Sequence, residues 1–248
     1  MKVVIDPGHG GKDPGAVWPR RTPNPQYREK DIALEAAKML KSLLENRGAE
    51  VILTREKDEY LRLYDRAAVA VKEDADVFIS LHLNSAGTRA RGWEVWYHDY
   101  REEGFALAKK IAKALRRQSL IPEHGQNPRS DYQRYRRGFG VLRGLKGKVP
   151  GVLVELGFIT NSEDRRILTN PTQLEAILRR IADAVMPTPI RAEALIPIVC
   201  EGRVVGRAKI ADGRSYLVTP LRNLLEGLGM EVIWKGHEIE ILKGGEKR

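Results

Sequence analysis

The chain has few of the features that mark disulfide-stapled, membrane-spanning or secreted proteins. Cys200 is its only cysteine, which excludes both an intramolecular disulfide and a cysteine-rich zinc motif. No apolar run approaches the roughly 20 residues that a transmembrane helix needs, and the opening MKVVIDPGHGG lacks the basic, apolar and small-residue order of a signal peptide. We therefore expect no integral membrane segment, and a protein made in the cytoplasm without a signal peptide.

Acidic residues are outnumbered by basic ones, and the formal net charge is +10. Such a surplus attracts anionic partners, so nucleic acid, an anionic membrane surface and an anionic cell wall all fit the charge alone. Because no RNA- or DNA-binding motif accompanies the charge, we expect no nucleic-acid partner. The basic residues are densest at Arg129, Arg134, Arg136, Arg137 and Arg143, where a solvated basic face is the simplest interpretation.

Strand-like and helix-like segments alternate over the first three quarters of the chain. Apolar runs predict strands at 2–6, 50–54, 76–83 and 149–158. Helical spacing predicts helices at 31–47, 61–71, 102–118 and 162–185. Residues 92–98 alternate like an edge strand, and 119–148 suggest a long surface loop over the site. This order predicts an α/β domain, a mostly parallel twisted sheet flanked by helices.

A second, smaller domain is predicted after a proline-containing linker. Two prolines in MPTPI (186–190) interrupt the alternation. We place a catalytic domain at 1–186, the linker at 187–192 and a small α+β domain at 193–248. Its short β-rich runs are separated by Glu-Gly and Asp-Gly turns, and a helix is expected in TPLRNLLEGLG after Thr219.

Two histidines and two glutamates occur in settings that suit a hydrolytic zinc site. His9 in DPGHGG follows the first strand, while His82 in SLHLNS and Glu155 in VLVELGF lie near the ends of later strands. Sites in open α/β sheets gather at the carboxyl ends of strands. Glu29 opens the first helix, where the helix dipole favours a carboxylate. Catalytic zinc takes three protein ligands and a water, and a carboxylate off the metal can move the proton.

Each of these residues also has an ordinary structural interpretation. A lone histidine at a strand end is more often a hydrogen-bonded core residue than a ligand, and Glu29 alone would be a common first-turn glutamate. Glu155 is harder to explain in this way, because a carboxylate within an apolar strand is costly to bury without a partner. Taken together, the four residues favour one shared site.

The chain resembles the zinc-dependent N-acetylmuramoyl-L-alanine amidases of the Amidase_3 type, which cleave peptidoglycan. The resemblance covers residues 2–185 and rests on segments that occur in family order. These are IDPGHGGKDPGA, EKDIAL, VILTREKDEYLRLYDR, ISLHLNSA, GWEVWY and VPGVLVELGFITNSED. It implies that His9, Glu29 and His82 hold zinc, and that Glu155 is the catalytic acid and base.

The resemblance also leaves some residues open. The segment before Glu29 is a few residues longer than is usual, so Glu35 is the alternative ligand if the register shifts. Asn84 and Arg66 fit the family pattern, with a structural role or one beside the ligands. Asn84 and Trp18, which lies in the longer segment, are candidates for binding substrate. His98, His124 and His237 match no motif and are expected on the surface or in loops.

The implied reaction is hydrolysis of the amide between N-acetylmuramic acid and L-alanine of the stem peptide. We expect a monomer that acts on peptidoglycan after release, as a phage endolysin or another autolysin, with anionic wall polymers as further partners. The alternatives are a zinc peptidase acting within the stem peptide and a non-catalytic basic wall-binding protein. Residues beyond the linker resemble the small domain at the N-terminal region of copper amine oxidases, and we expect a wall-binding or packing module.

Overall fold

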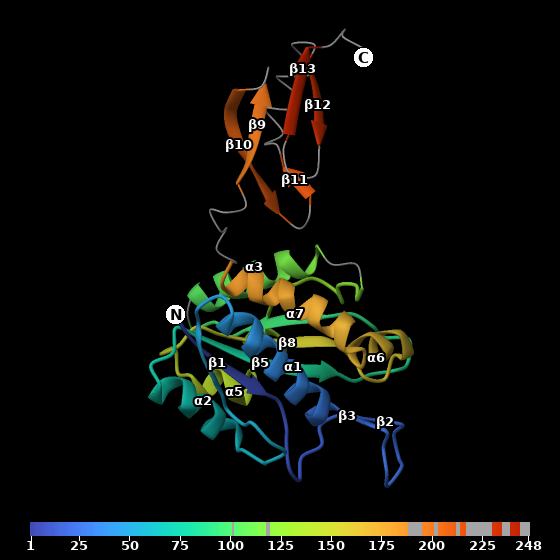
Figure 1. Cartoon of the computed structure of the whole chain (residues 1–248). Helices are drawn as coiled ribbons and strands as arrows, with labels where there is room; N and C mark the ends of the chain where they lie inside the picture. Colours follow the sequence, from blue (N-terminus) through green and yellow to red (C-terminus); the bar gives the residue numbers. More distant parts are fainter. Residues whose placement is uncertain are drawn as a thin grey trace. The chain divides into compact units, whose positions relative to one another are not determined.

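The computed structural model describes residues 1–100, 102–117 and 120–187 with their side chains, together with the backbone of five strands beyond them. The chain divides into two compact units, Met1–Thr188 and Pro189–Arg248. Figure 1 shows the elements of both, and each unit is described by itself.

A six-stranded sheet forms the centre of the first unit (Figure 1). Its strands are β1 (Lys2–Pro7), β4 (Glu50–Leu53), β5 (Val77–Asn84), β6 (Glu94–Tyr97), β7 (Arg129–Ser130) and β8 (Gly151–Phe158). They lie in the order β4-β1-β5-β8-β6-β7, and the first four run parallel to one another while β6 runs antiparallel to β8. The predicted mostly parallel sheet is therefore confirmed.

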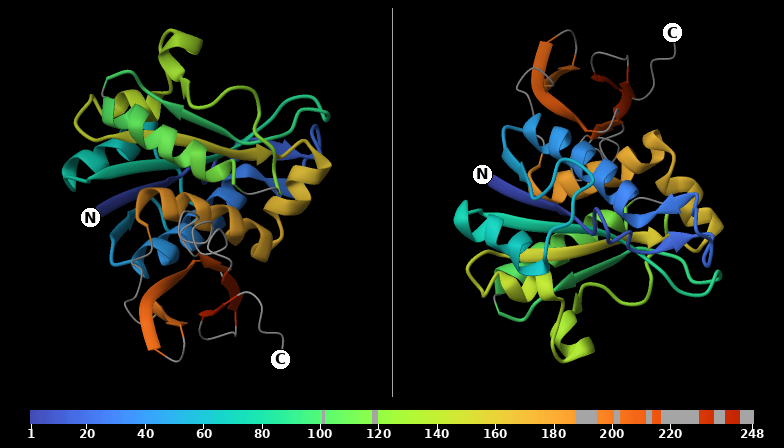
Figure 2. Two further views of the ribbon diagram at one scale, coloured as in Figure 1. Left: turned by 90° about the horizontal axis from the view of Figure 1, so that it is seen from above. Right: turned by 90° about the horizontal axis from the view of Figure 1, so that it is seen from below.

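Helices cover both faces of this sheet, as Figure 2 shows. One face packs against α1 (Glu29–Glu45), α3 (Glu102–Leu115) and α7 (Pro171–Val185). The other packs against α2 (Leu63–Lys72) and α5 (Gly140–Gly144). Because Val3 and Val4 point to opposite faces and are both fully buried, the central strands are apolar on both sides. Among the described helices, none has the length and apolar composition needed to cross a bilayer.

The segment predicted as a surface loop over the site, residues 119–148, was assigned wrongly. It contains β7, α4 (Asp131–Tyr135) and α5. Val141, Leu142 and Leu145 are buried against α2 and the sheet, where they form part of the second hydrophobic core. The helical stretches are too short to show a periodicity, so their apolar residues could not be recognised as a core face.

Two further boundaries differ from the prediction. Residues 162–185 form two helices, α6 (Ser162–Leu168) and α7, because the Asn170 side chain accepts a hydrogen bond from Gln173 N at 3.0 Å and starts a new helix before Pro171. The predicted edge strand β6 lies inside the sheet, between β8 and β7. Trp93 and Trp96 are buried and pack within the two hydrophobic cores.

The second unit contains a five-stranded sheet in the order β11-β10-β9-β13-β12. Its strands are β9 (Leu195–Cys200), β10 (Arg203–Ala211), β11 (Arg214–Tyr216), β12 (Met230–Trp234) and β13 (Ile239–Lys243). Residues 188–192 of the predicted linker, the helix expected after Thr219, and His237 lie outside the described residues. The wall-binding or packing role of this unit stays a prediction.

A buried ion pair ties α2 to the carboxyl end of β1. Nη1 of Arg66 donates to Oδ1 of Asp6 at 3.0 Å, and both side chains are almost wholly buried. The same guanidinium donates to the carbonyl oxygens of Pro7 at 2.8 Å and His9 at 2.6 Å. Arg66 therefore fixes the backbone that carries His9, in agreement with the predicted structural role or role beside the ligands.

Replacing Arg66 by Met should lower the free energy of unfolding by about 3–5 kcal/mol, because it leaves the Asp6 carboxylate buried without its partner. Denaturant unfolding followed by circular dichroism measures this loss. The control is Arg62→Met, which removes an exposed pair with Asp65 and should change the midpoint little. Equal midpoints for the two variants would contradict the stabilising role of the buried pair.

Candidate metal centre

His9 lies in the glycine-rich turn that follows β1. Its own backbone is in the left-handed region, with φ of 61°, which is uncommon for a residue with a side chain. Nδ1 of the ring lies 2.8 Å from Oδ2 of Asp13, and Nε2 lies 3.1 Å from Oε1 of Glu29. Asp13 thereby sets the orientation of the ring and leaves Nε2 facing the site, an arrangement common among metal-binding histidines.

Glu29 is the first residue of α1, and its carboxylate is buried. Oε2 accepts a hydrogen bond from Ala16 N at 2.8 Å, and Oε1 accepts one from Leu83 N at 3.0 Å. Burial alone would raise its pKa. The hydrogen bonds and positive charge of His82 and His9 outweigh burial, so the pKa of Glu29 lies well below its usual range. Glu29 is therefore held as a carboxylate.

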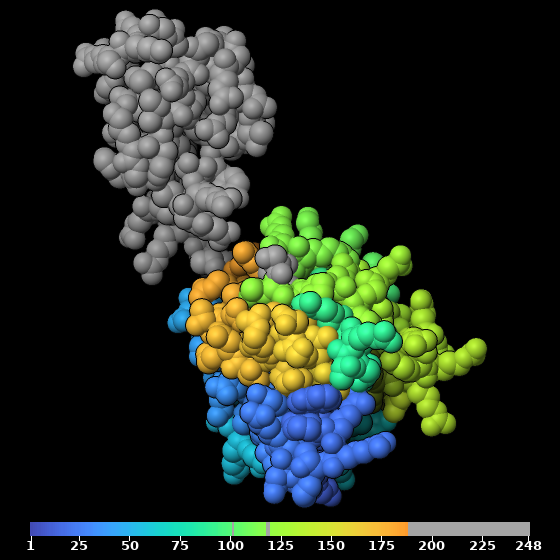
Figure 3. Space-filling view, turned by 90° about the vertical axis from the view of Figure 1, so that its right-hand side faces the viewer, coloured from blue at the N-terminus to red at the C-terminus, as the bar shows by residue number. Residues whose placement is uncertain are grey.

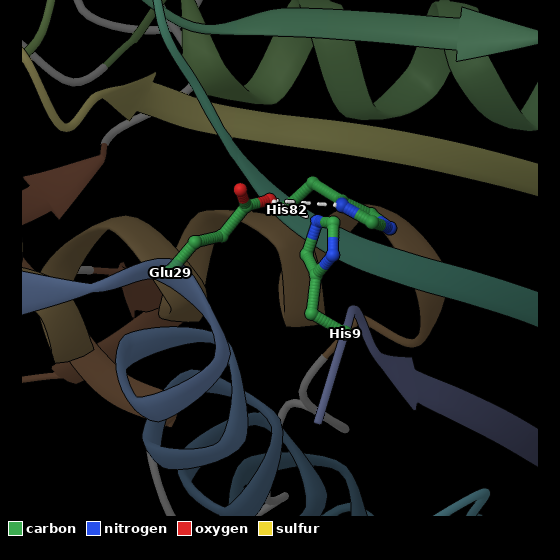
Figure 4. A group of neighbouring side chains, drawn as sticks. All are labelled: His9, Glu29 and His82. Carbon is green, nitrogen blue, oxygen red and sulfur yellow. Dashed lines mark hydrogen bonds and ion pairs between the residues drawn. The ribbon is translucent and has the colours of Figure 1, made fainter. Parts of the chain in front are cut away.

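His82, near the end of β5, completes a close group with His9 and Glu29, as Figure 4 shows. Its Nδ1 lies 2.9 Å from Oε1 of Glu29, and the two imidazole rings meet edge to face with centroids 5.0 Å apart. One nitrogen from each histidine and one oxygen from Glu29 all lie within 4.8 Å of one another.

The pKa of His9 is raised. Burial disfavours the charged imidazolium, but hydrogen bonds and negative charge from Glu29, and then from Asp13, outweigh burial.

Glu155 on β8 lies directly beside His82 in the sheet, where the two residues are register partners. Its Oε2 is buried and has no hydrogen-bond partner among the described residues. Burial, followed by the negative charges of Glu29 and Glu94, raises the pKa of Glu155 well above its usual value. A raised pKa lets a carboxyl group hold a proton more readily than an ordinary glutamate does, which suits a residue that must carry a proton.

The donor set suits a divalent metal of the zinc type. Two imidazole nitrogens and one carboxylate oxygen converge, as in catalytic zinc sites that keep one position for water. Oε2 of Glu155 is buried and accepts no hydrogen bond from the described residues, so its contacts do not indicate a structural role. The structure thus brings together the four residues that the sequence suggested.

The remaining sequence candidates lie at the edge of this group or outside it. Glu35 is exposed on α1 and is not part of the His–Glu–His group, so Glu29 is the residue that joins the histidines. Nδ2 of Asn84 donates to Oε2 of Glu94 at 3.1 Å, which holds Asn84 at the end of β5. Trp18 lies in the hairpin of β2 (Val17–Trp18) and β3 (Tyr27–Arg28), where the Arg165 guanidinium covers its ring at 4.9 Å.

Sequence reasoning missed two residues near the group. Asp13, which orients His9, was read only as part of the DPGA motif. Glu94 is the register partner of Glu155 on β6, and its Oε1 accepts from Nη1 of Arg129 at 2.9 Å. The alternation in GWEVWY predicts which face of the strand carries Glu94, but not which residue lies beside it. Only the pairing of β6 with β8 places Glu94 next to Glu155.

Gly15 is required by the close approach of the chain to the side chains of His9 and Glu29. Its φ is +65°, and a Cβ there would lie 2.6 Å from Cδ2 of His9 and 2.7 Å from Oε2 of Glu29. Gly15→Ala should therefore displace both side chains and weaken zinc binding by roughly 10- to 100-fold, as measured by competition with a chelating dye. Gly87→Ala is the control, since a Cβ at that position meets nothing within 4 Å. Unchanged affinity in Gly15→Ala would show that the site relaxes around the methyl group.

The sequence profile of the N-acetylmuramoyl-L-alanine amidases (Amidase_3) matches residues 3–186. The chain belongs to this family. A probable cell wall amidase, LytH of Staphylococcus saprophyticus, is 36% identical over 192 residues, which are 77% of this chain and 57% of that protein. LytH of Staphylococcus epidermidis is 36% identical over 183 residues. The chain thus spans little more than half the length of these curated relatives.

Solved structures of the same family share the fold of the first unit. The amidase AmiC2 of Nostoc punctiforme is 34% identical with a TM-score of 0.64, over 75% of this chain and 94% of that one. The catalytic domain of CwlV from Bacillus (Paenibacillus) polymyxa var. colistinus is 32% identical with a TM-score of 0.63, over 74% and 95%. These matches confirm the family and fold inferred from the sequence motifs.

Proposed function

We propose that this protein hydrolyses the amide bond between N-acetylmuramic acid and the L-alanine of the peptidoglycan stem peptide, with zinc held by His9, Glu29 and His82. The observation that carries the proposal is the convergence of three ligand atoms within 4.8 Å, next to the unpartnered Oε2 of Glu155. Family membership supports the choice of bond, because the matching profile is that of N-acetylmuramoyl-L-alanine amidases.

Each residue has a distinct task in the proposed reaction. Bound zinc would supply a Lewis acid that acidifies water and polarises the scissile carbonyl. Glu155 takes a proton from the attacking water while the water oxygen forms a bond to the carbonyl carbon. It then delivers that proton to the alanine nitrogen as the carbon–nitrogen bond breaks. The products are a lactyl carboxylate and a stem peptide with a free amino terminus.

Asp13 and the backbone around the site keep this geometry. Asp13 holds Nδ1 of His9, so the same ring nitrogen always faces Glu29. The amide groups of Ala16 and Leu83 hold both oxygens of Glu29. The ligands are therefore positioned by hydrogen bonds of the fold itself.

The proposed partner is peptidoglycan, on which the protein acts as a monomer once it reaches the wall, as an endolysin or another autolysin does. Support comes from relatives whose names describe cell wall amidases. The surplus of positive charge also favours contact with an anionic wall polymer.

Digestion of purified peptidoglycan, with and without a chelator, tests the proposal. Mass analysis should show free stem peptides that begin with L-alanine, the chelator should abolish their release, and added zinc should restore it. Fragments cut within the stem peptide would instead identify a zinc peptidase. Binding to the wall without any soluble product would favour the non-catalytic alternative.

A further inference from the structure

Three arginines that the proposed reaction does not use line one pocket. Of the five arginines that make residues 129–143 the most basic stretch, three line a pocket of about 410 Å³ together with a histidine and two tyrosines. The six lining residues are His98, Tyr100, Tyr132, Arg136, Arg137 and Arg143. Figure 3 shows the yellow-green segment that carries the arginines standing out from the surface of the first unit.

This pocket lies away from the metal centre. Glu94 on β6 is the register partner of Glu155, whereas Tyr97 pairs with Val152 near the start of β8. His98 follows Tyr97, so it lies four residues along the strand direction from Glu94, or roughly 13 Å. The pocket and Glu155 therefore flank opposite ends of the same pair of strands.

A buried histidine–aspartate pair forms one side of the pocket. Nδ1 of His98 lies 2.6 Å from Oδ1 of Asp131, and the Asp131 side chain has no solvent exposure. Oδ2 of Asp131 accepts from Phe139 N at 2.7 Å. The Tyr100 ring packs edge to face on His98 with centroids 4.1 Å apart. Asp131 thus engages Nδ1, which leaves Nε2 as the ring atom that a ligand can reach. His98 was expected on the surface or in a loop. It lies in the loop after β6 but is buried there, which its position after an assumed edge strand did not indicate.

The turn at Gly138 packs closely against His98 and Asp131. Gly138 has φ of +62°, and a Cβ there would lie 2.7 Å from Nδ1 of His98 and 2.8 Å from Oδ2 of Asp131. Nη1 of Arg143 donates to the carbonyl of Arg137 at 2.6 Å, and its Nη2 donates to the Tyr64 hydroxyl at 3.0 Å. Arg143 is therefore held in place, and its remaining N–H groups stay available.

The carboxylates of Asp99 and Asp131 beside the pocket are engaged by other residues. Within the described part of the chain, none of Arg136, Arg137 and Arg143 forms an ion pair with a carboxylate. The buried Asp131 is engaged by His98, and the exposed Asp99 accepts a hydrogen bond from Ser130. Three guanidinium groups in one concave site are a strong attraction for a multivalent oxyanion, because their N–H groups match phosphate oxygens in pairs.

We propose that this pocket binds a phosphate group, with Arg136, Arg137 and Arg143 as its charge partners and Nε2 of His98 as a further contact. Phosphate fits better than carboxylate because it offers more oxygens and more charge to three guanidinium groups. The exposed rings of Tyr100 and Tyr132 provide flat surfaces for the polyol or sugar that carries the phosphate. The site is independent of the proposed hydrolysis, since binding requires no bond to break.

Titration calorimetry of the zinc-loaded full chain tests the proposal, with inorganic phosphate and purified poly(glycerol phosphate) as separate probes. Any phosphate bound by the metal is common to all variants, so differences between variants report on the pocket. Arg137→Gln should weaken binding about tenfold, the loss expected for one charge-assisted hydrogen bond. Arg134→Gln is the matched control, because Arg134 lies on α4, close to Arg137 in the sequence, but does not line the pocket.

Arg143→Gln should weaken phosphate binding as Arg137→Gln does, and thermal unfolding shows that each variant is folded. Tighter binding of the polymer than of inorganic phosphate assigns the site to a polymer-borne group, whereas equal binding assigns it to the free anion. If Arg137→Gln and Arg134→Gln lost the same amount of phosphate affinity, binding would reflect general attraction to the positive charge rather than the pocket, and the proposal would be overturned. Absence of binding to both probes, or equal binding of a muropeptide carboxylate, would overturn it as well.

Discussion

Glu155→Gln is expected to bind zinc as the wild type does and to lose about 10²- to 10⁴-fold of its rate on peptidoglycan. The amide is nearly the same size as the carboxyl group but cannot accept the proton of the attacking water. Glu155 lies outside the His–Glu–His group, so zinc content should be unchanged. Release of stem peptides with time, normalised to bound zinc, measures the effect.

The control for this variant is Glu163→Gln, an exposed glutamate at the start of α6. It should keep both zinc and activity. Near-normal hydrolysis by Glu155→Gln would remove Glu155 from the proton-transfer role. Loss of zinc in that variant would instead make Glu155 a ligand and require a different proton carrier.

The site could be predicted because its members occur on elements with strong local signals. Continuous apolar runs identify β5 and β8 as buried parallel strands, and parallel strands place their carboxyl ends at one edge. His82 and Glu155 follow from this rule, and their register pairing in the structure agrees with it. His9 and Glu29 needed the family motifs in addition, because a turn histidine and a first-turn glutamate carry little information alone.

The contacts that hold the site together could not be predicted in the same way. Asp13 acts through a hydrogen bond across a glycine-rich turn, and Arg66 reaches three groups of β1 and its loop from a different element. Arg66 has no periodic pattern that distinguishes it from a surface arginine. Long-range contacts of this kind depend on which elements pack together, and local propensity does not encode that choice.

The same limit explains why the pocket around His98 was missed. Its residues come from the loop after β6, from α4 and the loop that follows it, and from the last turn of α5. None of these segments is long enough to show a periodic face. In the sequence, the arginines of this region resemble a solvated basic face. In the structure, three of these arginines line one pocket with His98, which is held by the buried Asp131 and by the close approach of Gly138. A charge-rich segment can therefore contain a shaped site that composition alone does not reveal.

Glu29→Gln should abolish activity and reduce zinc affinity by more than the roughly 10- to 100-fold that loss of an outer partner costs. The amide is neutral and can accept through only one of its two end atoms, whereas the carboxylate accepts from both Ala16 N and Leu83 N while facing the two histidines. Zinc content by mass spectrometry and affinity by dye competition give the two readouts.

Glu35→Gln is the decisive comparison, because Glu35 is the alternative ligand suggested by the longer segment before the first helix. It lies exposed on α1, so its variant should bind zinc and hydrolyse peptidoglycan as the wild type does. Because both substitutions remove one negative charge from the same helix, a general electrostatic effect would appear in both. Retained zinc in Glu29→Gln together with lost zinc in Glu35→Gln would transfer the ligand role to Glu35, which lies further along α1. That outcome would require the helix to shift relative to β5, since it is now Oε1 of Glu29 that lies 2.9 Å from the His82 ring.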